Sequence, residues 1–384
     1  MFITEISLKN WRNFPKADVK IGFRSFFVGP NASGKSNFLD AIRFLRDLAQ
    51  TGGGLQKAVE IRGGISKIRC LSARQDPDVQ LEVSLSETPN GPSIWKYEIG
   101  IKQEPRGNRL PYIAFERVYK NNALILKRPN DGDKKDQVRL TQTYLEQLST
   151  NAEFREIAKF FDSIQYLHIV PQLVRHSDSY SGPGVPGDPF GLHFLEKLSL
   201  TPDRTRKSRL KRIQAALKLA VPQLEELEYV QDKGHSHLEA KYAHWRPHGG
   251  KQREDQFSDG TLRLIGLMWA LLDGDALLLL EEPELSLHSG IVKAIPALMF
   301  RLVGKKRQII ITTHSTDLLS DKGIGAAETI ILKPSKEGTT AQVSSDNEQI
   351  VALLQSGLSV ADVVIPRTRP ANLDQLELFS YDSN

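Results

Sequence analysis

The sequence of 384 residues predicts an α/β fold whose core sheet is assembled from both ends of the chain. Near the amino terminus, an apolar strand runs into a glycine-rich loop and then into a helix, within residues 23–48. After residue 257, helix and strand patterns alternate to about residue 355, which is typical of a parallel sheet. With 40% hydrophobic and 25% charged residues, the chain is long enough for one large domain with a sub-domain, or for two domains.

The first elements follow from the spacing of apolar residues. Ile3, Ile6 and Leu8 alternate with polar neighbours, as in a half-buried strand. Residues 23–28 form a second, buried strand, and the apolar residues of 38–48 lie three and four apart, as on one face of a helix. Strand, glycine loop and helix thus stand in the order that a phosphate-binding loop requires.

The next segment has a different period. Between about residues 59 and 128, apolar and polar residues alternate, so we expect an antiparallel sheet inserted after the first helix. Residues 142–163 have helical spacing, and 164–172 include a short buried strand. The apolar residues of 210–224 define an amphipathic helix, which begins with six basic residues between Arg204 and Arg212.

These elements divide the chain into four predicted parts. Residues 1–139 form the N-terminal part of the core with the antiparallel lobe, and 140–256 form an inserted helical lobe with a loop rich in Gly and Pro. Residues 257–365 form the C-terminal part of the core. Residues 366–384 are expected to be a flexible tail.

Charge and cysteine content exclude some classes of protein. Lys and Arg (51) outnumber Asp and Glu (46), which gives a formal charge of +5 and a pI near 9.0. This mild surplus permits contact with nucleic acid without establishing it. Cys70 is the only cysteine, so disulfides within the chain and cysteine-rich zinc sites are excluded. No apolar run approaches the ~18 residues of a membrane span, and the amino terminus lacks a signal-peptide stretch, so we expect a cytoplasmic protein without membrane contact.

The glycine-rich loop fits the phosphate-binding pattern G-x-x-x-x-G-K-[ST] without a gap. Its glycines allow backbone N–H groups to close around phosphates, and the helix amino terminus adds a partial positive charge. Lys35 is expected to reach the β- and γ-phosphates, and the Ser36 hydroxyl to bind Mg²⁺. The residues predicted to bind ATP here are Gly29, Asn31, Ala32, Ser33, Gly34, Lys35, Ser36 and Asn37.

Acidic residues follow a strand of four leucines, 277–280. Glu281 and Glu282 stand at its carboxyl end, where doubly wound sheets bind ligands. Glu281 is predicted to hold Mg²⁺ through water, and Glu282 to orient and deprotonate the attacking water. The alternative is a strand that ends in a solvated acidic turn.

A histidine ends the next apolar strand along the chain. We predict that His314 senses the γ-phosphate from this strand end, which makes it a catalytic residue beside Glu282. For a lone histidine, a structural or surface role is the alternative.

A Ser-Asp-Gly-Thr turn, 258–261, opens a helix shortly before the acidic strand. Taken alone, it is equally a serine cap with good helix-start chemistry. Together with the three motifs above, it resembles the signature motif of the ABC ATPase class. The resemblance implies that the turn, Ser258, Asp259 and Gly260, contacts the γ-phosphate of an ATP held by the other subunit, so that two chains enclose two ATP molecules as a homodimer.

The set of motifs resembles the RecF/SMC-like group of ABC ATPases, and within it the AAA-type 21, or RecF-like, ATPases. Glu-Glu-Pro-Glu in place of the commoner Asp-Glu, and Ser-Asp-Gly-Thr in place of Ser-Gly-Gly-Gln, suit this group better than transporters. The chain departs from relatives that carry a coiled-coil arm, and from the OLD nucleases, which carry a Toprim nuclease domain after the ATPase. The matching segments touch both ends of the chain: 3–14, 29–42, 257–272, 277–288 and 309–319.

The pattern of the group also implies a glutamine at a strand end that touches Mg²⁺ and the attacking water. Gln172 is our candidate and Gln75 the reserve, with an ordinary loop glutamine as the alternative for Gln172. By the same analogy, Asn10, Arg12 and Asn13 line the nucleotide.

Two weaker signals concern partners. The basic residues of 204–212 either pair with DNA phosphates or form a solvated helix face. The segment Gln375–Phe379 resembles the short peptide that bacterial proteins dock onto the replicative sliding clamp, and the alternative is a tail that packs on its own domain.

These inferences together predict an Mg²⁺-dependent ATPase that dimerises on binding ATP and acts as a switch on DNA, in repair or in anti-phage defence. Its effector, such as a nuclease, would be a separately encoded protein. The alternative is an ATP-gated scaffold that turns over slowly and holds or releases a toxic partner without coupling to DNA. A transporter ATPase ranks third, since the insert at 59–255 offers no standard membrane-coupling surface.

Overall fold

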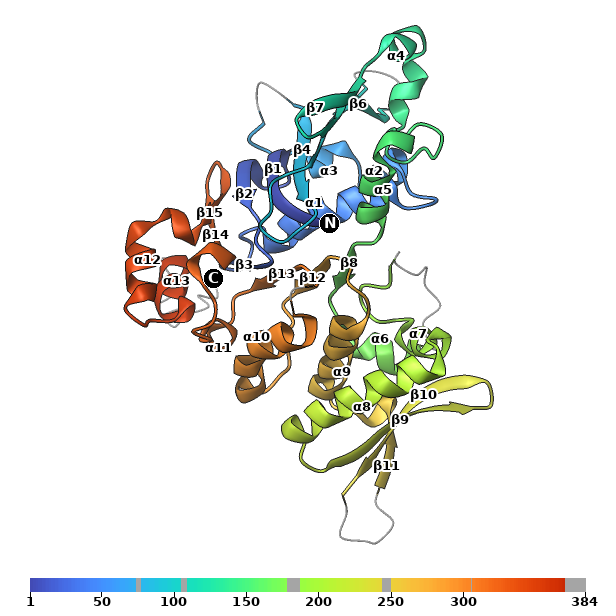
Figure 1. The fold of residues 1–384 in the computed structure, drawn as a ribbon, viewed down its shortest axis with the longest axis vertical. Coiled ribbons are helices and arrows are strands. Elements are labelled where there is room, and N and C mark those ends of the chain that lie inside the picture. Colours follow the sequence, from blue (N-terminus) through green and yellow to red (C-terminus); the bar gives the residue numbers. More distant parts are fainter. Residues whose placement is uncertain (74–76, 105–108, 178–186, 244–249, 305, 370–384) are drawn as a thin grey trace, which may run out of the picture. The chain divides into compact units, whose positions relative to one another are not determined.

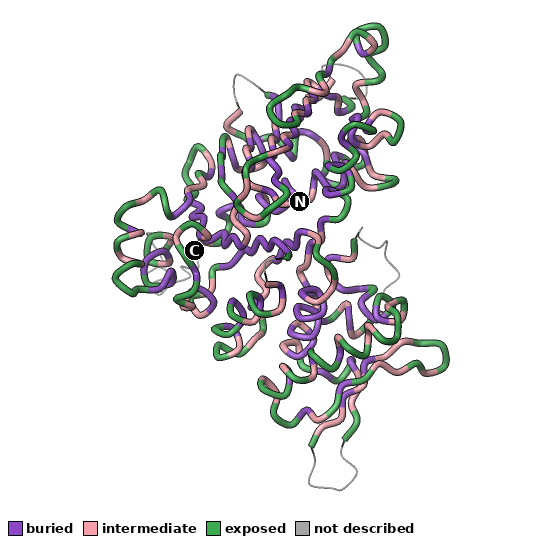
Figure 2. The backbone as a smooth tube through the Cα atoms, viewed as in Figure 1, coloured by how far each residue is buried: buried purple, intermediate pink, exposed green. Residues whose placement is uncertain are grey.

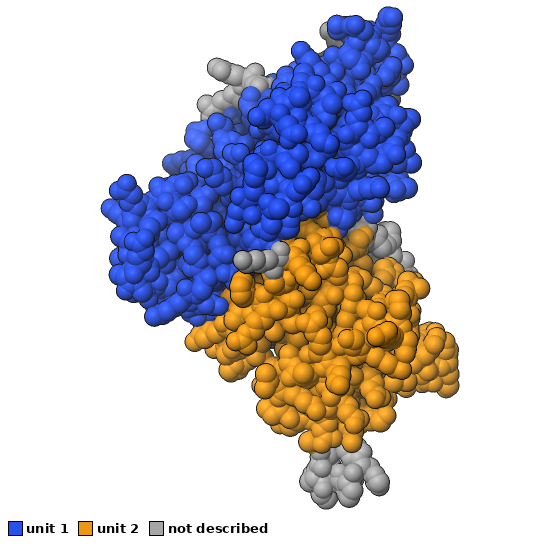
Figure 3. Space-filling view, viewed as in Figure 1, with its two compact units in different colours: residues 1–163, 312–384 blue, residues 164–311 orange. Residues whose placement is uncertain are grey.

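The structure is a computed structural model that describes residues 1–73, 77–104, 109–177, 187–243, 250–304 and 306–369. The chain forms two compact units, shown in different colours in Figure 3. Unit 1 contains Met1–Ser163 and Thr312–Asn384, and unit 2 contains Ile164–Ile311.

Unit 1 contains a six-stranded antiparallel sheet with the order β2-β1-β4-β5-β6-β7. The expected antiparallel lobe is therefore present at 79–128, and the first two strands of the chain extend it (Figure 1). Residues 55–68 form two short helices instead of strand. The strands are β1 (Phe2–Trp11), β2 (Phe14–Lys20), β4 (Val79–Ser86), β5 (Trp95–Gln103), β6 (Pro111–Lys120) and β7 (Ala123–Arg128), and the helices are α2 (Leu55–Glu60) and α3 (Ile65–Ile68).

The glycine loop of unit 1 follows the strand β3 (Arg24–Val28) and leads into the helix α1 (Lys35–Ala49). Every residue of β3 is buried (Figure 2), as expected for a strand covered on both faces. This strand runs parallel to β14 (Thr329–Ser335), and β14 forms an antiparallel hairpin with β15 (Gly338–Val343). Strands from both ends of the chain therefore lie together, as predicted. Three helices complete this unit: α11 (Thr316–Leu319), α12 (Glu348–Gln355) and α13 (Val360–Thr368).

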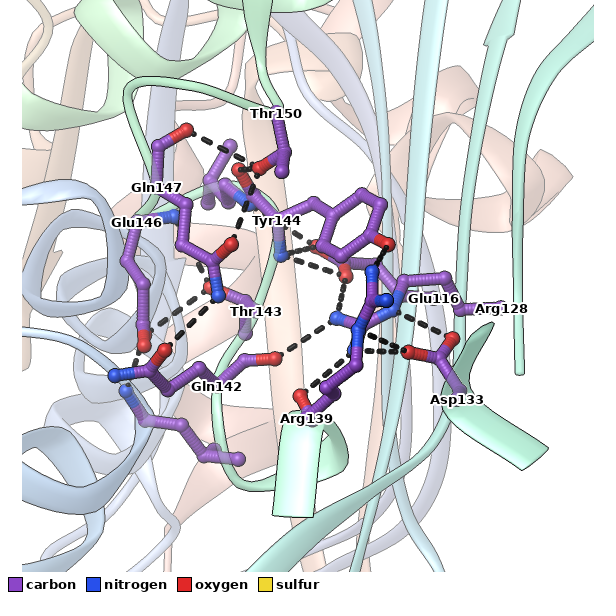
Figure 4. A network of polar contacts seen from close by, with 12 residues as sticks. Glu116, Arg128, Asp133, Arg139, Gln142, Thr143, Tyr144, Glu146, Gln147 and Thr150 are labelled. Atoms are coloured by element: carbon purple, nitrogen blue, oxygen red, sulfur yellow. Dashed lines mark hydrogen bonds and ion pairs between the residues drawn. The ribbon is translucent and has the colours of Figure 1, made fainter. Parts of the chain in front are cut away.

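The prediction of helix over 142–163 is wrong for its first ten residues. Helix is present only in α5 (Arg155–Asp162) and in a 3-10 turn before it, and α4 (Asp131–Lys135) and a 3-10 turn over 137–141 precede this segment. The carboxylate of Glu116 explains the difference, because it accepts the backbone N–H groups of Tyr144, at 2.9 Å, and Leu145, at 3.3 Å. These groups are thereby taken out of a helical ladder (Figure 4).

A buried ion network surrounds the same carboxylate. Glu116, Arg128 and Asp133 have fully buried side chains, and the Arg128 guanidinium donates to both acids at 3.0 Å. The Tyr97 hydroxyl also donates to Glu116, at 3.0 Å. Burial raises the pKa of Glu116 despite these partners, whereas Arg128 and its bonds lower the pKa of Asp133 against the effect of burial. The network fixes the loop after β7 against the sheet (Figure 4).

Unit 2 pairs the strand β8 (Gln165–Leu167) in parallel with β12 (Leu278–Glu281). The amide N–H of Leu278 donates to the carbonyl of Gln308, at 3.0 Å, next to the strand β13 (Ile309–Thr313). The alternation expected after residue 257 is therefore present. The helices of this unit are α6 (Pro171–Arg175), α7 (Phe194–Leu200), α8 (Asp203–Ala220), α9 (Asp259–Leu272) and α10 (Ser289–Val303).

An antiparallel sheet that the sequence did not predict forms part of unit 2. Its order is β11-β10-β9, with β9 (Leu224–Asp232), β10 (His235–Tyr242) and β11 (Gly250–Arg253). We expected Leu224 on the amphipathic helix, but α8 ends at Ala220 because Pro222 cannot continue it. Leu224 instead begins β9, and its side chain is buried in the same core as Leu210, Ile213 and Leu217 of α8.

The guanidinium of Arg307 lies in the interior of unit 2. It donates to the carbonyls of Ala270 and Ala276 and to the side chain of Gln165, so it joins α9, the segment before β12, and β8. Burial lowers the pKa of Arg307 to about 10.

Across the described ranges, no helix is both long enough and apolar enough to cross a bilayer.

Candidate nucleotide-binding site

The phosphate loop of unit 1 has the backbone that its sequence requires. Ala32 and Gly34 have positive φ angles of 61° and 93°, and Gly34 is the N-cap residue of α1. The first turn of α1 contains no acidic residue, so its partial positive charge is not neutralised from within the helix. Asn31, Ala32 and Ser36 are exposed. The loop therefore presents backbone donors and a helix amino terminus to an anion.

Close contacts explain the two glycines of the loop. A Cβ atom on Gly29 would lie 2.5 Å from the hydroxyl of Ser33, and one on Gly34 would lie 2.2 Å from the amide of Asn13. Ser33 is fully buried, and its Oγ has no hydrogen-bond partner among the described residues. Lys35 is buried, and its ammonium donates to the carbonyls of Gly29, at 3.0 Å, and Pro30, at 3.2 Å. The loop is thus packed around its own lysine.

Asn13 joins the loop to β15 by hydrogen bonds. Its amide donates to the carbonyl of Ser33, at 3.1 Å, and to the hydroxyl of Thr339 in β15, at 2.7 Å. The amide of Asn37 donates to Asn13, at 2.8 Å. The contacts of Asn13 and Asn37 described here are therefore with protein, although we predicted both beside the nucleotide.

The other two residues expected beside the nucleotide also have protein partners. Asn10 donates to the carbonyl of Asp78, at 2.9 Å, and Arg12 donates to the carboxylate of Asp40 on α1, at 2.7 Å. Arg62 contacts the same carboxylate. Burial raises the pKa of Asp40, but the charges and hydrogen bonds of Arg62 and Arg12 outweigh it, so the pKa lies below its ordinary value. Arg12 and Arg62 thereby anchor the helix that carries the loop.

The acidic strand end lies in unit 2. Glu281 is the last residue of β12, and Glu282 follows with a φ of 43°, in the left-handed region that a residue with a Cβ rarely adopts. The hydroxyl of Tyr166 donates to Oε2 of Glu281, at 2.5 Å, and Nδ1 of His168 lies 3.2 Å from the carbonyl of Glu281. Since a carbonyl only accepts, this nitrogen carries the proton. Our sequence analysis missed both residues, although they are the second and fourth residues of 165–168, directly beside the acidic strand.

Gln172 does not lie at the end of β8. It lies in α6, where Pro171 takes the first helical position, and its amide donates to Asp259 of the Ser-Asp-Gly-Thr turn, at 3.2 Å. Arg175 holds the same carboxylate, at 2.6 Å. The role of Gln172 at a metal therefore stays a prediction. The reserve candidate, Gln75, lies outside the described residues.

The Ser-Asp-Gly-Thr turn lines a pocket of about 410 Å³ in unit 2. Ser258 caps α9, since its Oγ accepts the N–H of Thr261 at 3.1 Å. Gly260 approaches Ser286 so closely that a Cβ would lie 2.8 Å from the carbonyl of Ser286. His288 caps α10 by accepting the N–H of Gly290, at 3.1 Å. Two helix amino termini thus open on one pocket.

His314 follows the strand β13 and is exposed. Thr312 and Thr313 before it are fully buried, and Oγ1 of Thr312 has no hydrogen-bond partner in the part of the chain that the structure describes. The hydroxyl of Thr313 accepts the N–H of Ser315, at 2.9 Å, and Ser315 caps α11. His314 therefore lies between the end of β13 and the cap of α11.

The donor set fits magnesium. The predicted ligands Ser36, Glu281 and Gln172 carry oxygen donors, which magnesium prefers. Among the described residues no group of three or more His, Cys, Asp or Glu residues could hold a metal. That is expected where a magnesium ion is bound by a few protein oxygens together with substrate phosphates.

Comparison with known proteins identifies the family. The family described as "AAA domain, putative AbiEii toxin, Type IV TA system" matches residues 25–321, which is more than half of the chain. The chain belongs to this AAA-domain family. In its motifs, its partial matches and its fold, this member of the AAA-domain family resembles the RecF/SMC-like group of ABC-class ATPases, as predicted.

Curated relatives resemble only parts of this AAA-domain protein. A DNA replication and repair protein RecF from Lactobacillus johnsonii is 36% identical over 99 residues, 25% of this chain and 25% of the relative. The RecF protein of Streptococcus agalactiae serotype Ia is 50% identical over 46 residues, 12% of either chain. The match thus spans a quarter or less of these relatives.

Solved structures resemble the whole fold. An SMC head bound to the C-winged helix domain of ScpA has a TM-score of 0.54 and 16% identity, over 89% of this chain and 98% of the other. A second SMC head, with an extended coiled coil and the C-terminal domain of ScpA from Pyrococcus furiosus, has a TM-score of 0.50 and 12% identity, over 92% and 99%. The predicted ABC-type ATPase head is therefore confirmed as the fold.

Proposed function

We propose that this protein binds Mg²⁺ and ATP, dimerises on ATP and hydrolyses it. The observation that carries the proposal is the phosphate loop, in which a buried lysine, two glycines that tolerate no side chain, and an unneutralised helix amino terminus come together. Lys35 would contact the β- and γ-phosphates, and Ser36 and Glu281 would hold the magnesium, which supplies charge neutralisation on the phosphates. Glu282 would deprotonate the attacking water, and His314 would sense the γ-phosphate.

Dimerisation is proposed from the pocket at the Ser-Asp-Gly-Thr turn. Two helix amino termini, of α9 and α10, open on it, and a helix amino terminus stabilises a nearby anion by about 0.3–1 kcal/mol. The first turn of α9 carries the carboxylate of Asp259, which is paired with Arg175 at 2.6 Å. A γ-phosphate held by a second copy of this chain is the anion that we assign to this pocket. ATP then favours the closed dimer over ADP, because only ATP has a γ-phosphate to contact.

The ATP-driven switch is proposed to act on DNA. The RecF relatives are named for DNA replication and repair, and the chain has a formal charge of +5. The basic residues of α8 divide into two sets. Arg206 and Lys207 pair with Asp203 and Arg209 pairs with Asp273, whereas the remaining three of the six between 204 and 212 are exposed and are our candidates for phosphate contacts: Arg204, Lys211 and Arg212.

A separately encoded effector and a role in repair or anti-phage defence belong to the same proposal. The second candidate is the ATP-gated scaffold that holds or releases a toxic partner. The family description favours it, since it names a putative toxin of a toxin–antitoxin system. Docking on a sliding clamp through Gln375–Phe379 also stays a proposal, and that segment lies outside the described residues.

One measurement separates the candidates: the ATPase rate per chain against protein concentration, with and without duplex DNA, beside Glu282→Gln as the inactive control. A rate that rises with concentration and with DNA supports a dimerising, DNA-coupled ATPase. A slow rate that DNA does not change favours the scaffold. No activity above the control at any concentration would refute both as ATPases.

A further inference from the structure

We propose that Tyr166, on β8, and His168, directly after β8, are positioning residues for the acidic pair at the end of β12. This inference rests on the proposed function, because it assigns the magnesium to Glu281 and the attacking water to Glu282. Tyr166 holds the side chain of Glu281, and His168 holds its backbone carbonyl, one peptide bond before Glu282.

The strand register brings these groups together. In the parallel pair, Tyr166 lies beside Leu279 and Leu167 lies beside Leu280. Tyr166 lies on β8 and His168 directly after it, and both contact Glu281 at the end of β12. The contact of Tyr166 with Glu281 therefore joins two paired strands, and strands hold functional groups more precisely than loops do.

The contact of Tyr166 with Glu281 is a strong hydrogen bond. Its O···O distance of 2.5 Å is typical of a hydroxyl that donates to a carboxylate. Tyr166 is only 6% exposed, so little water competes for its hydroxyl. A glutamate side chain otherwise has several rotamers, and the phenol selects one of them. Glu281 is thereby oriented before any metal arrives.

The contact of His168 acts on the backbone. It restrains the peptide group that joins Glu281 to Glu282, and Glu282 has the unusual φ of 43°. Such a conformation persists only where surrounding groups impose it. We therefore assign to His168 the orientation of Glu282, and to Tyr166 the orientation of Glu281.

Tyr166→Phe tests the role of Tyr166 in orienting Glu281, because it keeps the ring and removes only the hydroxyl. The readouts are the ATPase rate and the affinity for Mn²⁺ with a non-hydrolysable ATP analogue, measured by electron paramagnetic resonance of free Mn²⁺. We expect the Mn²⁺ affinity and kcat each to fall about tenfold, the effect of losing one hydrogen bond to a charged group. The affinity for the nucleotide without metal is expected to stay unchanged, which a general loss of structure would not allow.

Tyr97→Phe is the matched control, since it also removes a buried phenol from a carboxylate, that of Glu116 in unit 1. It is expected to lower Tm and to leave the Mn²⁺ affinity unchanged. For the role of His168 in orienting Glu282, His168→Ala is expected to lower kcat, and His168→Asn, whose amide can donate to the same carbonyl, to restore part of it. This pair also keeps the inference testable if Tyr166→Phe does not fold.

The outcomes separate this inference from the proposed function. If the wild-type protein neither binds Mn²⁺ with the nucleotide nor hydrolyses ATP, the proposed function fails. If it does both, and Glu281→Gln loses the metal while Tyr166→Phe and His168→Ala match wild type, only the positioning role is overturned.

Discussion

Glu146 is expected to destabilise the folded protein as the pH rises, and Glu146→Gln to remove that effect. Its carboxylate accepts the N–H of Leu55, at 2.7 Å, and the hydroxyl of Thr143, at 3.2 Å. Burial nevertheless raises the pKa of Glu146 from the ordinary value of 4.5 to about 7. Gln can still accept the Leu55 N–H, and it cannot ionise.

The sign of the effect follows from the two pKa values. A carboxyl group whose pKa is higher in the folded state binds its proton more tightly there, so folding is favoured at low pH. The stabilisation by the protonated Glu146 is fully present below pH 4.5 and is lost as the pH rises through about 7. Above that pH, the free energy of unfolding no longer changes through this group. The full shift corresponds to ~3 kcal/mol at 1.36 kcal/mol for each pKa unit. Because the side chain is only partly buried, solvent screening reduces this to roughly 1–2 kcal/mol.

The assay is the Tm of wild type and Glu146→Gln, measured by scanning fluorimetry between pH 4.5 and 8.5. For a unit of this size, roughly 1–2 kcal/mol shifts Tm by about 2–8 °C. The variant is expected to gain stability over wild type between pH 4.5 and 7, with a constant advantage above that. A Tm difference that is the same at pH 5 and pH 8 would refute the assignment of the raised pKa to Glu146.

Three further predictions concern the nucleotide. Glu282→Gln is expected to lower kcat by about 10²-fold or more while ATP stays bound and holds two chains together. Light scattering would detect this dimer. A monomer under these conditions contradicts a nucleotide site shared between two chains. Ser258→Arg is expected to block the dimer and leave ATP binding to the single chain largely intact, as titration with a fluorescent ATP would show, whereas loss of binding would mean that Ser258 acts on its own chain's nucleotide. Gly34→Ala is expected to abolish ATP binding, because the added Cβ would overlap the Asn13 amide. The φ of 93° at this position is left-handed, which alone costs a residue with a Cβ about 1–2 kcal/mol. Wild-type affinity in the same titration would disprove the requirement for glycine.

The sequence predicted those elements whose residues interact with close neighbours in the chain. The glycine loop, the strand of leucines before Glu281 and the period-two strands at 79–128 each have a local pattern, and the structure contains all of them. Residues 142–151 have helical spacing but form no helix, and Glu116 on β6 accepts two of their backbone N–H groups, those of Tyr144 and Leu145. No local pattern reveals a partner that lies almost thirty positions away.

The supporting residues of the site were also beyond local patterns. Lys305–Gln308 is charged, and nothing in it marks Arg307 as buried. Asn13 was placed beside the nucleotide, whereas its partners here are Ser33, Asn37 and Thr339, the last of them 326 positions along the chain. Tyr166 and His168 stand two apart at the end of a short apolar run, but neither residue type at this spacing marks a contact with the acidic strand, which is more than a hundred positions away.

The order in which the ribosome releases the chain gives the support of the phosphate loop a further meaning. The loop, 29–36, emerges well before residues 329–339, yet the strand before it, β3, pairs with β14, and Asn13, which bonds to the loop, also bonds to Thr339. Arg24 at the start of β3 likewise pairs with Glu328, at 2.9 Å. Such distant pairing is late and slow in folding. A nascent chain that still lacks residues 329–339 therefore carries the phosphate loop without the contacts that support it, and we expect the loop to bind nucleotide only after these residues have been made.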